Sequence, residues 1–189
     1  MLSKTRMNLL FARAFFRHPR MLGSIIPSSR FLIRELLQHV DWARARVIVE
    51  YGPGIGNVTQ EILRRMRADA KLIIIETNHD FVRYLRAYFT DERLAIVAGS
   101  AADVAAILQR QGHAKASCII SGIPFSTISQ ALKEHILLES RAVLEPGGAF
   151  VLYQFSSRLL TDLQRIFKNV KRGFELKNVL PAHWFFCTP

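Results

Sequence analysis

The sequence predicts a single α/β domain built around a doubly wound, mostly parallel β-sheet. From residue 45 onward, short and continuously apolar runs alternate with helical stretches. Runs of this kind are typical of parallel strands that helices cover on both faces. The chain has 189 residues, of which 50% are hydrophobic, and this matches the size and core of one domain. We therefore expect this domain over residues 25–189, preceded by a separate arm over residues 1–24.

The expected elements follow one another in a regular order. A helix should begin near Arg30, with Ser28 or Ser29 as its N-cap. The last two strands, 174–179 and 183–187, are joined by a link too short to cross over the sheet, so they should form an antiparallel hairpin. Between these ends, we expect five strands at 46–51, 71–76, 94–97, 116–121 and 149–155, with helices at 58–66, 80–88, 101–111, 129–143 and near 159–167.

The most informative motif lies between the first expected strand and the first helix after it. Here the segment Glu50–Gly56 reads EYGPGIG, and Glu76 follows Gly56 by 20 residues at the end of the second strand. Glycines allow a sharp turn and a close approach of the backbone to a ligand. A carboxylate at the tip of the second strand is placed to receive the two hydroxyls of a ribose. The candidate cofactor-binding residues are Glu50, Gly52, Gly54, Gly56 and Glu76.

The spacing of these glycines separates two classes of cofactor. A dinucleotide site prefers G-x-G-x-x-G, which places a pyrophosphate at the helix N-terminus. Here the pattern is G-x-G-x-G with Glu50 just upstream. A carboxylate repels a pyrophosphate but suits the amino-acid end and the sulfonium of S-adenosylmethionine. We therefore predict S-adenosylmethionine as cofactor, with S-adenosylhomocysteine as product; a plain tight turn is the alternative.

Two further segments should border the same site, because ligands bind beyond the carboxyl ends of parallel strands. Ser100 and Ala101 follow the third strand. In this fold the adenine is expected there, often in contact with an aspartate at the position that Ser100 occupies here. Ser121 ends the fourth strand and begins a loop, SGIPF, that should face the transferred methyl group. Phe125 in this loop is expected to form an aromatic wall of the methyl-transfer site or, alternatively, to be an ordinary core residue.

The acceptor chemistry suggests three catalytic candidates. Methylation of an amine develops positive charge on nitrogen, and the faces of Phe125 and Tyr153 would stabilise that charge. Tyr153 and His183 are candidates for removing the proton, and desolvation of the ammonium is the alternative. The sulfonium is already activated, so the reaction needs no metal, and the sequence has no cluster with metal-ligand spacing. Cys118 and Cys187 are expected to be two buried thiols.

The N-terminal arm has an amphipathic pattern. On a helix, Arg6, Arg13, Arg17 and Arg20 share one narrow stripe beside an apolar face, and no acidic residue precedes Glu35. This combination is typical of an interfacial helix, with a helix packed on the domain as the alternative. The formal net charge of +11 favours anionic partners, either nucleic acid or a membrane surface. No apolar run is long enough to span a bilayer, and Arg13 and Arg17 interrupt any signal sequence.

Taken together, these segments resemble the bacterial phospholipid N-methyltransferases. The similarity rests on 23–29 (GSIIPSS), 50–56 (EYGPGIG), 76–78 (ETN), 121–125 (SGIPF) and 178–182 (NVLPA). It implies the Rossmann-like methyltransferase fold, an N-terminal membrane anchor, and cofactor contacts through Glu50, Gly52, Gly54 and Glu76. It also implies methylation of phosphatidylethanolamine toward phosphatidylcholine at the cytoplasmic face of the bacterial membrane, among anionic lipids and without nucleic acid. The number of methyl groups transferred stays open.

Two other functions compete with this interpretation. A ribosomal RNA adenine N6-methyltransferase would suit the basic charge. That family has Asn-Leu-Pro-Tyr or similar after the fourth strand, whereas here the corresponding residue is taken to be Ser121 and the aromatic is Phe125. A non-catalytic membrane-binding module is the other alternative, and the intact glycine motif with Glu76 argues against it.

Overall fold

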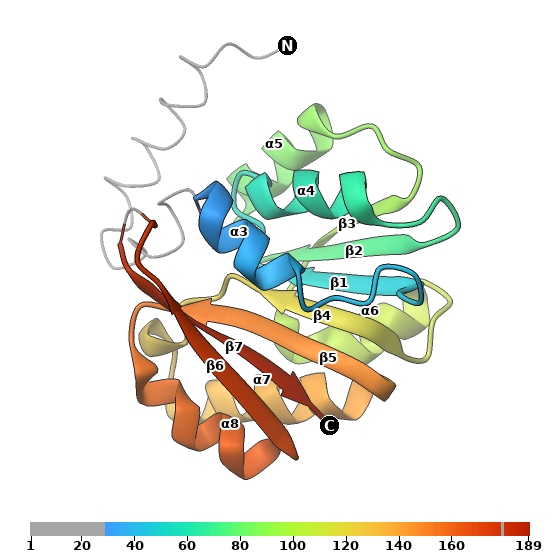
Figure 1. The fold of residues 1–189 in the computed structure, drawn as a ribbon. Coiled ribbons are helices and arrows are strands. Elements are labelled where there is room, and N and C mark those ends of the chain that lie inside the picture. Colours follow the sequence, from blue (N-terminus) through green and yellow to red (C-terminus); the bar gives the residue numbers. More distant parts are fainter. Residues whose placement is uncertain (1–28, 179) are drawn as a thin grey trace.

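A computed structural model describes residues 29–178 and 180–189 of the protein. They form one seven-stranded sheet of order β3-β2-β1-β4-β5-β7-β6 with helices on both faces (Figure 1). The predicted doubly wound α/β fold is therefore confirmed. The arm at residues 1–24, with its expected interfacial helix, lies outside the described residues, as does the candidate cap Ser28.

The elements alternate between strands and helices in the expected order. The strands are β1 (Val47–Tyr51), β2 (Lys71–Glu76), β3 (Leu94–Ala98), β4 (Ala116–Ser121), β5 (Leu144–Gln154), β6 (Asn169–Glu175) and β7 (Ala182–Thr188). The α-helices are α3 (Arg30–Leu37), α4 (Asn57–Arg65), α5 (His79–Tyr88), α6 (Val104–Arg110), α7 (Gln130–Val143) and α8 (Leu160–Ile166). Short 3₁₀ turns lie at η2 (Ala101–Asp103), η3 (Phe125–Thr127) and η4 (Ser157–Leu159).

The order of the strands places a crevice at the centre of the sheet. The strands β1 to β5 are mutually parallel, and β1 lies between β2 and β4. The chain first proceeds outward from β1 to β3 and then returns to the other side of β1 at β4. The loops after β1 and β4 therefore separate at this point, where open α/β sheets bind their ligands.

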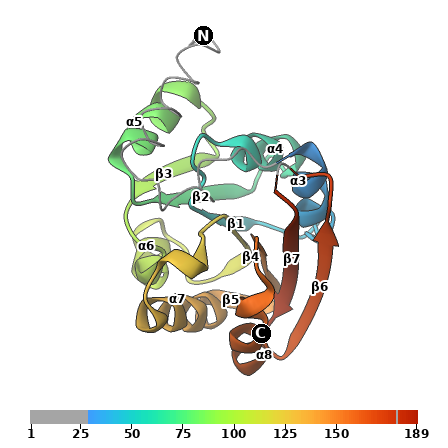
Figure 2. The same ribbon diagram turned by 90° about the vertical axis from the view of Figure 1, so that its left-hand side faces the viewer.

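Each face of the sheet has its own hydrophobic core. Side chains such as Ile48, Leu72 and Ile120 pack against α3, α4 and α5, whereas Val49, Ile119 and Phe150 pack on the opposite face. Figure 2 shows α3, α4 and α5 above the sheet and α6, α7 and α8 below it. Because both faces are covered, the central positions of strands β1, β2 and β4 are mostly apolar.

Side chains at the helix starts explain several boundaries. Ser29 caps α3, because its hydroxyl accepts a hydrogen bond from the backbone N–H of Leu32 at 3.2 Å. Asn78 caps α5 in the same way, and Ser129 caps α7. Each cap satisfies backbone donors that the first helical turn leaves unpaired. The prediction of a cap at Ser28 or Ser29 is thus confirmed for Ser29.

The C-terminal hairpin is antiparallel as predicted, but the expected position of its first strand was wrong. The strand β6 covers Asn169–Glu175 instead of 174–179, and residues 176–181 connect it to β7. β6 is an edge strand whose outer positions are exposed, so it lacks the apolar run on which the prediction relied. Gly173 lies beneath Trp184 of β7, whose ring fills the place where a Cβ would stand.

The described residues contain no helix that is both long enough and apolar enough to cross a membrane. Cys118 and Cys187 are both free and buried, as expected. Burial raises the pKa of each thiol to about 12, so neither is a reactive nucleophile at neutral pH.

Candidate active site

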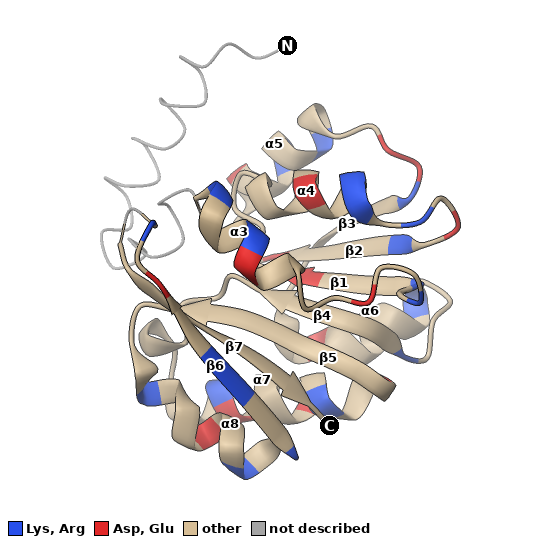
Figure 3. Ribbon diagram, viewed as in Figure 1, with Lys and Arg blue, Asp and Glu red and all other residues tan. Residues whose placement is uncertain are grey.

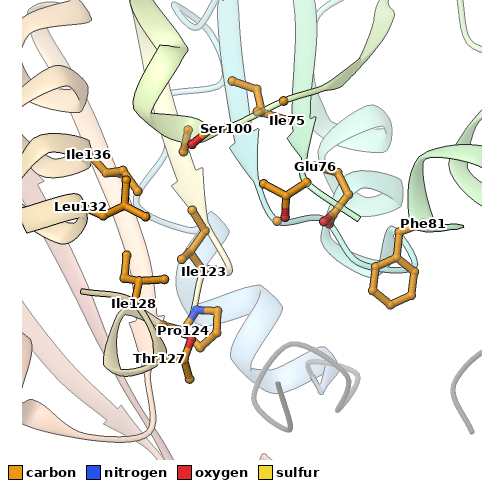
Figure 4. A pocket seen from close by; sticks show the side chains of 14 residues that line it. Ile75, Glu76, Phe81, Ser100, Ile123, Pro124, Thr127, Ile128, Leu132 and Ile136 are labelled. Atoms are coloured by element: carbon orange, nitrogen blue, oxygen red, sulfur yellow. Dashed lines mark hydrogen bonds between the residues drawn. The ribbon is translucent and has the colours of Figure 1, made fainter. Parts of the chain in front are cut away.

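A pocket opens at the carboxyl edge of the sheet, between the loops that follow β1 to β4. The space between these loops, including its opening to solvent, is about 700 Å³. One wall carries polar and backbone groups from the ends of β1, β2 and β3, and the other is largely apolar (Figure 4). The lining residues are Gly52, Ile75, Glu76, Thr77, Phe81, Gly99, Ser100, Ala101, Ile123, Pro124, Thr127, Ile128, Leu132 and Ile136.

The three predicted glycines have different structural roles. Gly52, Gly54 and Gly56 all have positive φ values, of 61°, 57° and 84°. Residues other than glycine rarely adopt such values. Gly52 borders the pocket, and its N–H donates to the carbonyl of Ile75 at 3.0 Å. Gly56 faces the protein interior, because a Cβ there would stand 2.5 Å from the ring of Phe89. The first glycine shapes the site, and the last allows α5 to pack closely behind it.

Glu76 lies where the sequence predicts a ribose acceptor. Its carboxylate accepts hydrogen bonds from the N–H of Asn78 at 2.9 Å and from that of Gly54 at 3.3 Å. These two bonds fix the carboxylate at the pocket wall, only 6% exposed, and leave acceptor capacity for ligand hydroxyls. Burial raises the pKa of this carboxyl above its ordinary value. A fixed acceptor beside a glycine turn fits the adenosine of S-adenosylmethionine.

Glu50 lies behind the glycine turn and does not border the pocket described above. It is buried, and its carboxylate accepts a hydrogen bond from the hydroxyl of Thr59 on α4 at 2.6 Å. Burial raises the pKa of Glu50 to about 8, and the neighbouring charge of Glu76 contributes in the same direction. Its contact with the amino-acid end of the cofactor stays a prediction.

The segment after β3 borders the pocket through Ser100 and Ala101. The Ser100 hydroxyl accepts from the N–H of Ala102 at 3.1 Å and so caps the turn η2. Through this capping bond Ser100 supports the turn, and its contact with the adenine stays a prediction.

The loop after β4 closes tightly against the glycine turn. The N–H of Gly122 donates to the carbonyl of Tyr51 at 2.9 Å. A Cβ at Gly122 would lie 3.0 Å from the carbonyl oxygen of Gly52, so the two loops touch backbone to backbone. Ser121 is buried, and its hydroxyl accepts from the N–H of Ile123 at 3.3 Å. Ser121 thus shapes the loop but does not border the pocket.

Phe125 is a core residue, which was the second of the two roles that the sequence allowed for it. Its side chain is buried in the cluster beneath α6, α7 and α8, and it does not border the pocket. The wall that the aromatic ring was expected to form is made by Ile123, Pro124 and Ile128.

The other two catalytic candidates lie on opposite faces of the sheet. Tyr153 packs with the α3–α5 side, and its hydroxyl is 3.7 Å from the place where a Cβ on Gly122 would stand. His183 on β7 pairs with Gln154, and its ring contacts Phe174 at 4.7 Å between centroids. Neither borders the pocket, so the structure does not bring Phe125, Tyr153 and His183 together. No group of three potential metal ligands occurs in the part of the chain that the structure describes.

Gln154 is a residue of the site that the sequence analysis missed. Its side-chain amide donates to the carbonyl of Ile123 at 2.8 Å, and its carbonyl accepts from the N–H of Phe125 at 3.1 Å. It is 6% exposed at the end of β5. Gln154 therefore holds the loop after β4, residues 121–125, in place from the neighbouring strand, and we call this segment the acceptor loop. A polar residue ending an otherwise apolar run was the signal that could have identified it.

Comparison with known proteins agrees with this geometry. The family model of ribosomal RNA adenine dimethylase matches residues 16–165. Ornithine lipid N-methyltransferase from Singulisphaera acidiphila is 33% identical over 180 residues, which cover 94% of each chain. Ribosomal RNA small subunit methyltransferase A from Laribacter hongkongensis is 32% identical over 155 residues, which cover 70% of this chain but 57% of that protein.

Among solved structures, precorrin-6y C5,15-methyltransferase from Geobacter metallireducens GS-15 has the same fold. Its TM-score is 0.65 at 14% identity, over 87% of this chain and 90% of that chain. The residues of the pocket, the family model and the near full-length relative agree with one another. The chain belongs to the ribosomal RNA adenine dimethylase family of methyltransferases, which use S-adenosylmethionine as cofactor and release S-adenosylhomocysteine.

Proposed function

We propose that this protein methylates the amine of a membrane aminolipid. The observation that carries the proposal is the 33% identity to ornithine lipid N-methyltransferase over 94% of both chains. The apolar wall formed by Ile123, Pro124 and Ile128 supports it, because such a wall excludes water from the acceptor side of the pocket. Ornithine lipid and phosphatidylethanolamine are the two candidate substrates, the second from the sequence resemblance.

The cofactor, when bound, supplies a methyl group already activated by the sulfonium. The protein must then bind, align and exclude water. Glu76 would hold the ribose, and the contact between Gly52 and Gly122 sets the distance between the cofactor side and the loop after β4. Gln154 fixes that loop through Ile123 and Phe125. An amine entering beside the apolar wall loses hydration, which favours its neutral and nucleophilic form.

A direct assay tests the proposal. Purified protein is incubated with methyl-labelled S-adenosylmethionine and vesicles that contain either phosphatidylethanolamine or ornithine lipid. Labelled lipid from at least one vesicle type is expected, and the type that gives it identifies the substrate. The variant Glu76→Gln should lose the activity, whereas the matched variant Glu92→Gln, on an exposed turn, should keep it. Absence of labelled lipid from both vesicles, with cofactor binding demonstrated by calorimetry, would contradict the proposal.

The proposed location follows from the proposed substrate. A lipid headgroup is reached from the membrane surface, so we place the protein peripherally on the cytoplasmic face of the bacterial membrane. The net charge of +11 supports an anionic leaflet as the partner. Fractionation of cells expressing the full chain should recover it with the membranes and release part of it at high salt.

Ribosomal RNA methylation is the second candidate, favoured by the family model and the basic charge. One sequence assignment needs correction here. Counting back from Pro124, the asparagine of Asn-Leu-Pro-Tyr corresponds to Gly122 and not to Ser121. Gly122 offers no side chain to an adenine amine, and the contact with Gly52 leaves little room for one. The same labelled-cofactor assay with small ribosomal subunits should give no labelled RNA; labelled RNA without labelled lipid would reverse the assignment.

A further inference from the structure

The loop between β6 and β7 exposes large apolar side chains. Leu176 is 69% exposed and Leu180 is 44% exposed, and Phe174 at the end of β6 is 50% exposed. Single exposed apolar residues are common on protein surfaces, but a group on one projecting loop indicates a contact surface. We define the β6–β7 tip by Phe174, Leu176, Lys177 and Leu180.

Hydrogen bonds of the neighbouring residues Lys177 and Asn178 accompany the exposure of these leucines. Asn178 is 9% exposed, and its side-chain carbonyl accepts from the N–H of Ser29 at 2.8 Å. Its amide donates to the carbonyl of Leu180 at 2.8 Å. The N–H of Lys177 also donates to the carboxylate of Glu175 at 2.6 Å. With Asn178 turned inward and tied to the start of α3, the leucines on either side of it point into solvent.

Two basic residues lie at the tip, Lys177 within it and Arg30 beside it. The Lys177 ammonium lies 5.4 Å from the ring centroid of Phe31, and the Arg30 guanidinium lies 5.0 Å from the same ring. Figure 3 shows this charge at the start of α3 and in the adjacent loop. A groove between α3 and α4 continues the basic surface. It is lined by Arg30 and Arg34 of α3 and by Arg64 and Arg65 of α4, the last two of which pair with Glu61.

The tip lies on the same side of the molecule as the candidate active site. The strand β6 runs antiparallel to β7, which runs antiparallel to β5, so β6 ends at the edge where β1 to β5 end. The pocket opens at this edge. Figure 2 views the molecule from that side and shows the β6–β7 connection beside α3. A flat surface that touches the tip would therefore lie across the edge that holds the site.

We propose that the β6–β7 tip is a membrane-contact element, with Leu176 and Leu180 entering the headgroup region of an anionic bilayer and Lys177 and Arg30 contacting lipid phosphates. This inference extends the proposed function, because it states which surface faces the bilayer that supplies the substrate. Apolar side chains flanked by cations match a leaflet that is anionic at its surface and apolar below it. A nucleic acid would use the cations and leave the leucines in water.

Fluorescent labelling of the tip tests the proposal directly. An environment-sensitive thiol dye is attached to the full-length variant Leu176→Cys and to a control variant, Leu138→Cys, whose site on α7 is 46% exposed. Cys118 and Cys187 are buried, so the dye should react with the introduced thiol. On vesicles of phosphatidylethanolamine and phosphatidylglycerol, the dye at position 176 should shift to the blue and be quenched by brominated lipid chains, whereas the dye at 138 should not.

Other occupants of the tip give different results in the same experiment. A blue shift at position 176 without vesicles that grows with protein concentration would mean that a second copy covers the tip. A shift without vesicles that is independent of concentration would mean that another segment of the same chain covers it. Either result, or an unshifted dye at 176 on protein that sediments with vesicles, would overturn the proposal.

Substitutions measure the contribution of the tip. Leu176→Ser combined with Leu180→Ser should weaken vesicle binding by about tenfold or more, because two apolar side chains stay in water. Lys177→Gln should weaken it by about fivefold at low salt, while Lys168→Gln, at the opposite end of β6, should not. All variants should bind S-adenosylmethionine as the parent protein does. Vesicle binding that is unchanged in both tip variants contradicts the proposal even if the lipid is methylated.

The two proposals fail in different ways. If labelled lipid never forms but the tip variants still lose vesicle binding, the membrane contact stands and the proposed reaction fails. If labelled lipid forms at the parental rate in every tip variant, with vesicle binding unchanged, the reaction stands and the membrane contact fails.

Discussion

The two edges of the parallel sheet hold their carboxylates in opposite ways. At the amino edge, Asp91 accepts a hydrogen bond from the Arg93 guanidinium at 2.6 Å, and this contact lowers the pKa of Asp91 to about 2. At the carboxyl edge, Glu50 and Glu76 accept only neutral donors among the hydrogen bonds described, from a hydroxyl and from backbone amides. Burial raises the pKa of both.

This difference indicates that the carboxyl edge is less favourable for stability than the amino edge and more suited to binding a ligand. A buried carboxylate without a cation costs free energy, and a cationic ligand offsets that cost. In the predicted binding mode, S-adenosylmethionine would bring its sulfonium and its amino group to the edge that holds Glu50 and Glu76. The ion pair at the amino edge stabilises the fold, whereas the buried carboxylates at the carboxyl edge lack a cation among their described partners and are suited to a cationic ligand.

The largest expected effect is at Glu76. The variant Glu76→Gln keeps the size of the side chain but loses the charge, so S-adenosylmethionine should bind about 10- to 100-fold more weakly, the range for hydrogen bonds to charged groups. Isothermal calorimetry measures this change. The exposed variant Glu92→Gln serves as the matched control. Affinity within about twofold of the parent for Glu76→Gln would remove the distinction between the two edges.

Glu50 gives the next largest effect, seen in stability. Its native pKa, about 8, lies above the reference value of 4.5, so the native state keeps a proton that the unfolded state releases. The stabilisation is therefore complete below about 4.5 and is lost as the pH rises through about 8. Without cofactor, Glu50→Gln should exceed the parent by about 2 kcal/mol in unfolding free energy near the upper end of this window.

Denaturant titrations across that pH range check the prediction. The two proteins should be alike in acid and should diverge as the pH rises. Saturating cofactor should reduce the divergence, because its positive charge stabilises the ionised carboxylate. Parallel profiles of unfolding free energy against pH for the parent and Glu50→Gln would contradict this prediction, because they would show that ionising the buried carboxyl does not destabilise the fold.

Gln154 sharpens the comparison, because it is a buried polar residue at the carboxyl edge that carries no charge. Gln154→Ala leaves the N–H of Phe125 unpaired, so the unfolding free energy should fall by about 1–3 kcal/mol. With the acceptor loop loosened, kcat should fall by about tenfold, while cofactor affinity stays within about twofold. The exposed variant Gln164→Ala is the control. Equal losses in cofactor affinity and kcat would mean that Gln154 supports the whole site instead of the acceptor loop.

The sequence predicted the cofactor half of the molecule better than the acceptor half. Strand β2 and the glycine turn are local features. An apolar run and closely spaced glycines can both be recognised within a few residues of sequence. The position of Glu76 follows directly from them. In contrast, the neighbours of Phe125 depend on which face of the sheet its loop turns toward, and no local pattern specifies this.

Long-range contacts explain the remaining misses. Gln154 acts on a loop 29 residues earlier in the chain, through hydrogen bonds that only the parallel pairing of β4 and β5 creates. The strand β6 was misplaced because Gly173 weakens its pattern, and its pairing is supported by Trp184 across the hairpin. Leu176 was taken for part of a strand, but it lies beyond the end of β6 with its side chain exposed.

The smallest effect is expected at the amino edge. Asp91 has a native pKa of about 2, below its reference value of 3.8, so its ion pair with Arg93 stabilises the fold above about 3.8 and is lost as the pH falls through about 2. Because both partners are partly exposed, Asp91→Asn should lower the unfolding free energy at neutral pH by only about 0.5–1 kcal/mol, and less at high salt. Cofactor affinity should not change, since Asp91 lies at the opposite edge from Glu76. Thermal unfolding and calorimetry on the same preparation check both points, and a loss of cofactor affinity would show that the two edges are coupled through β2 and β3.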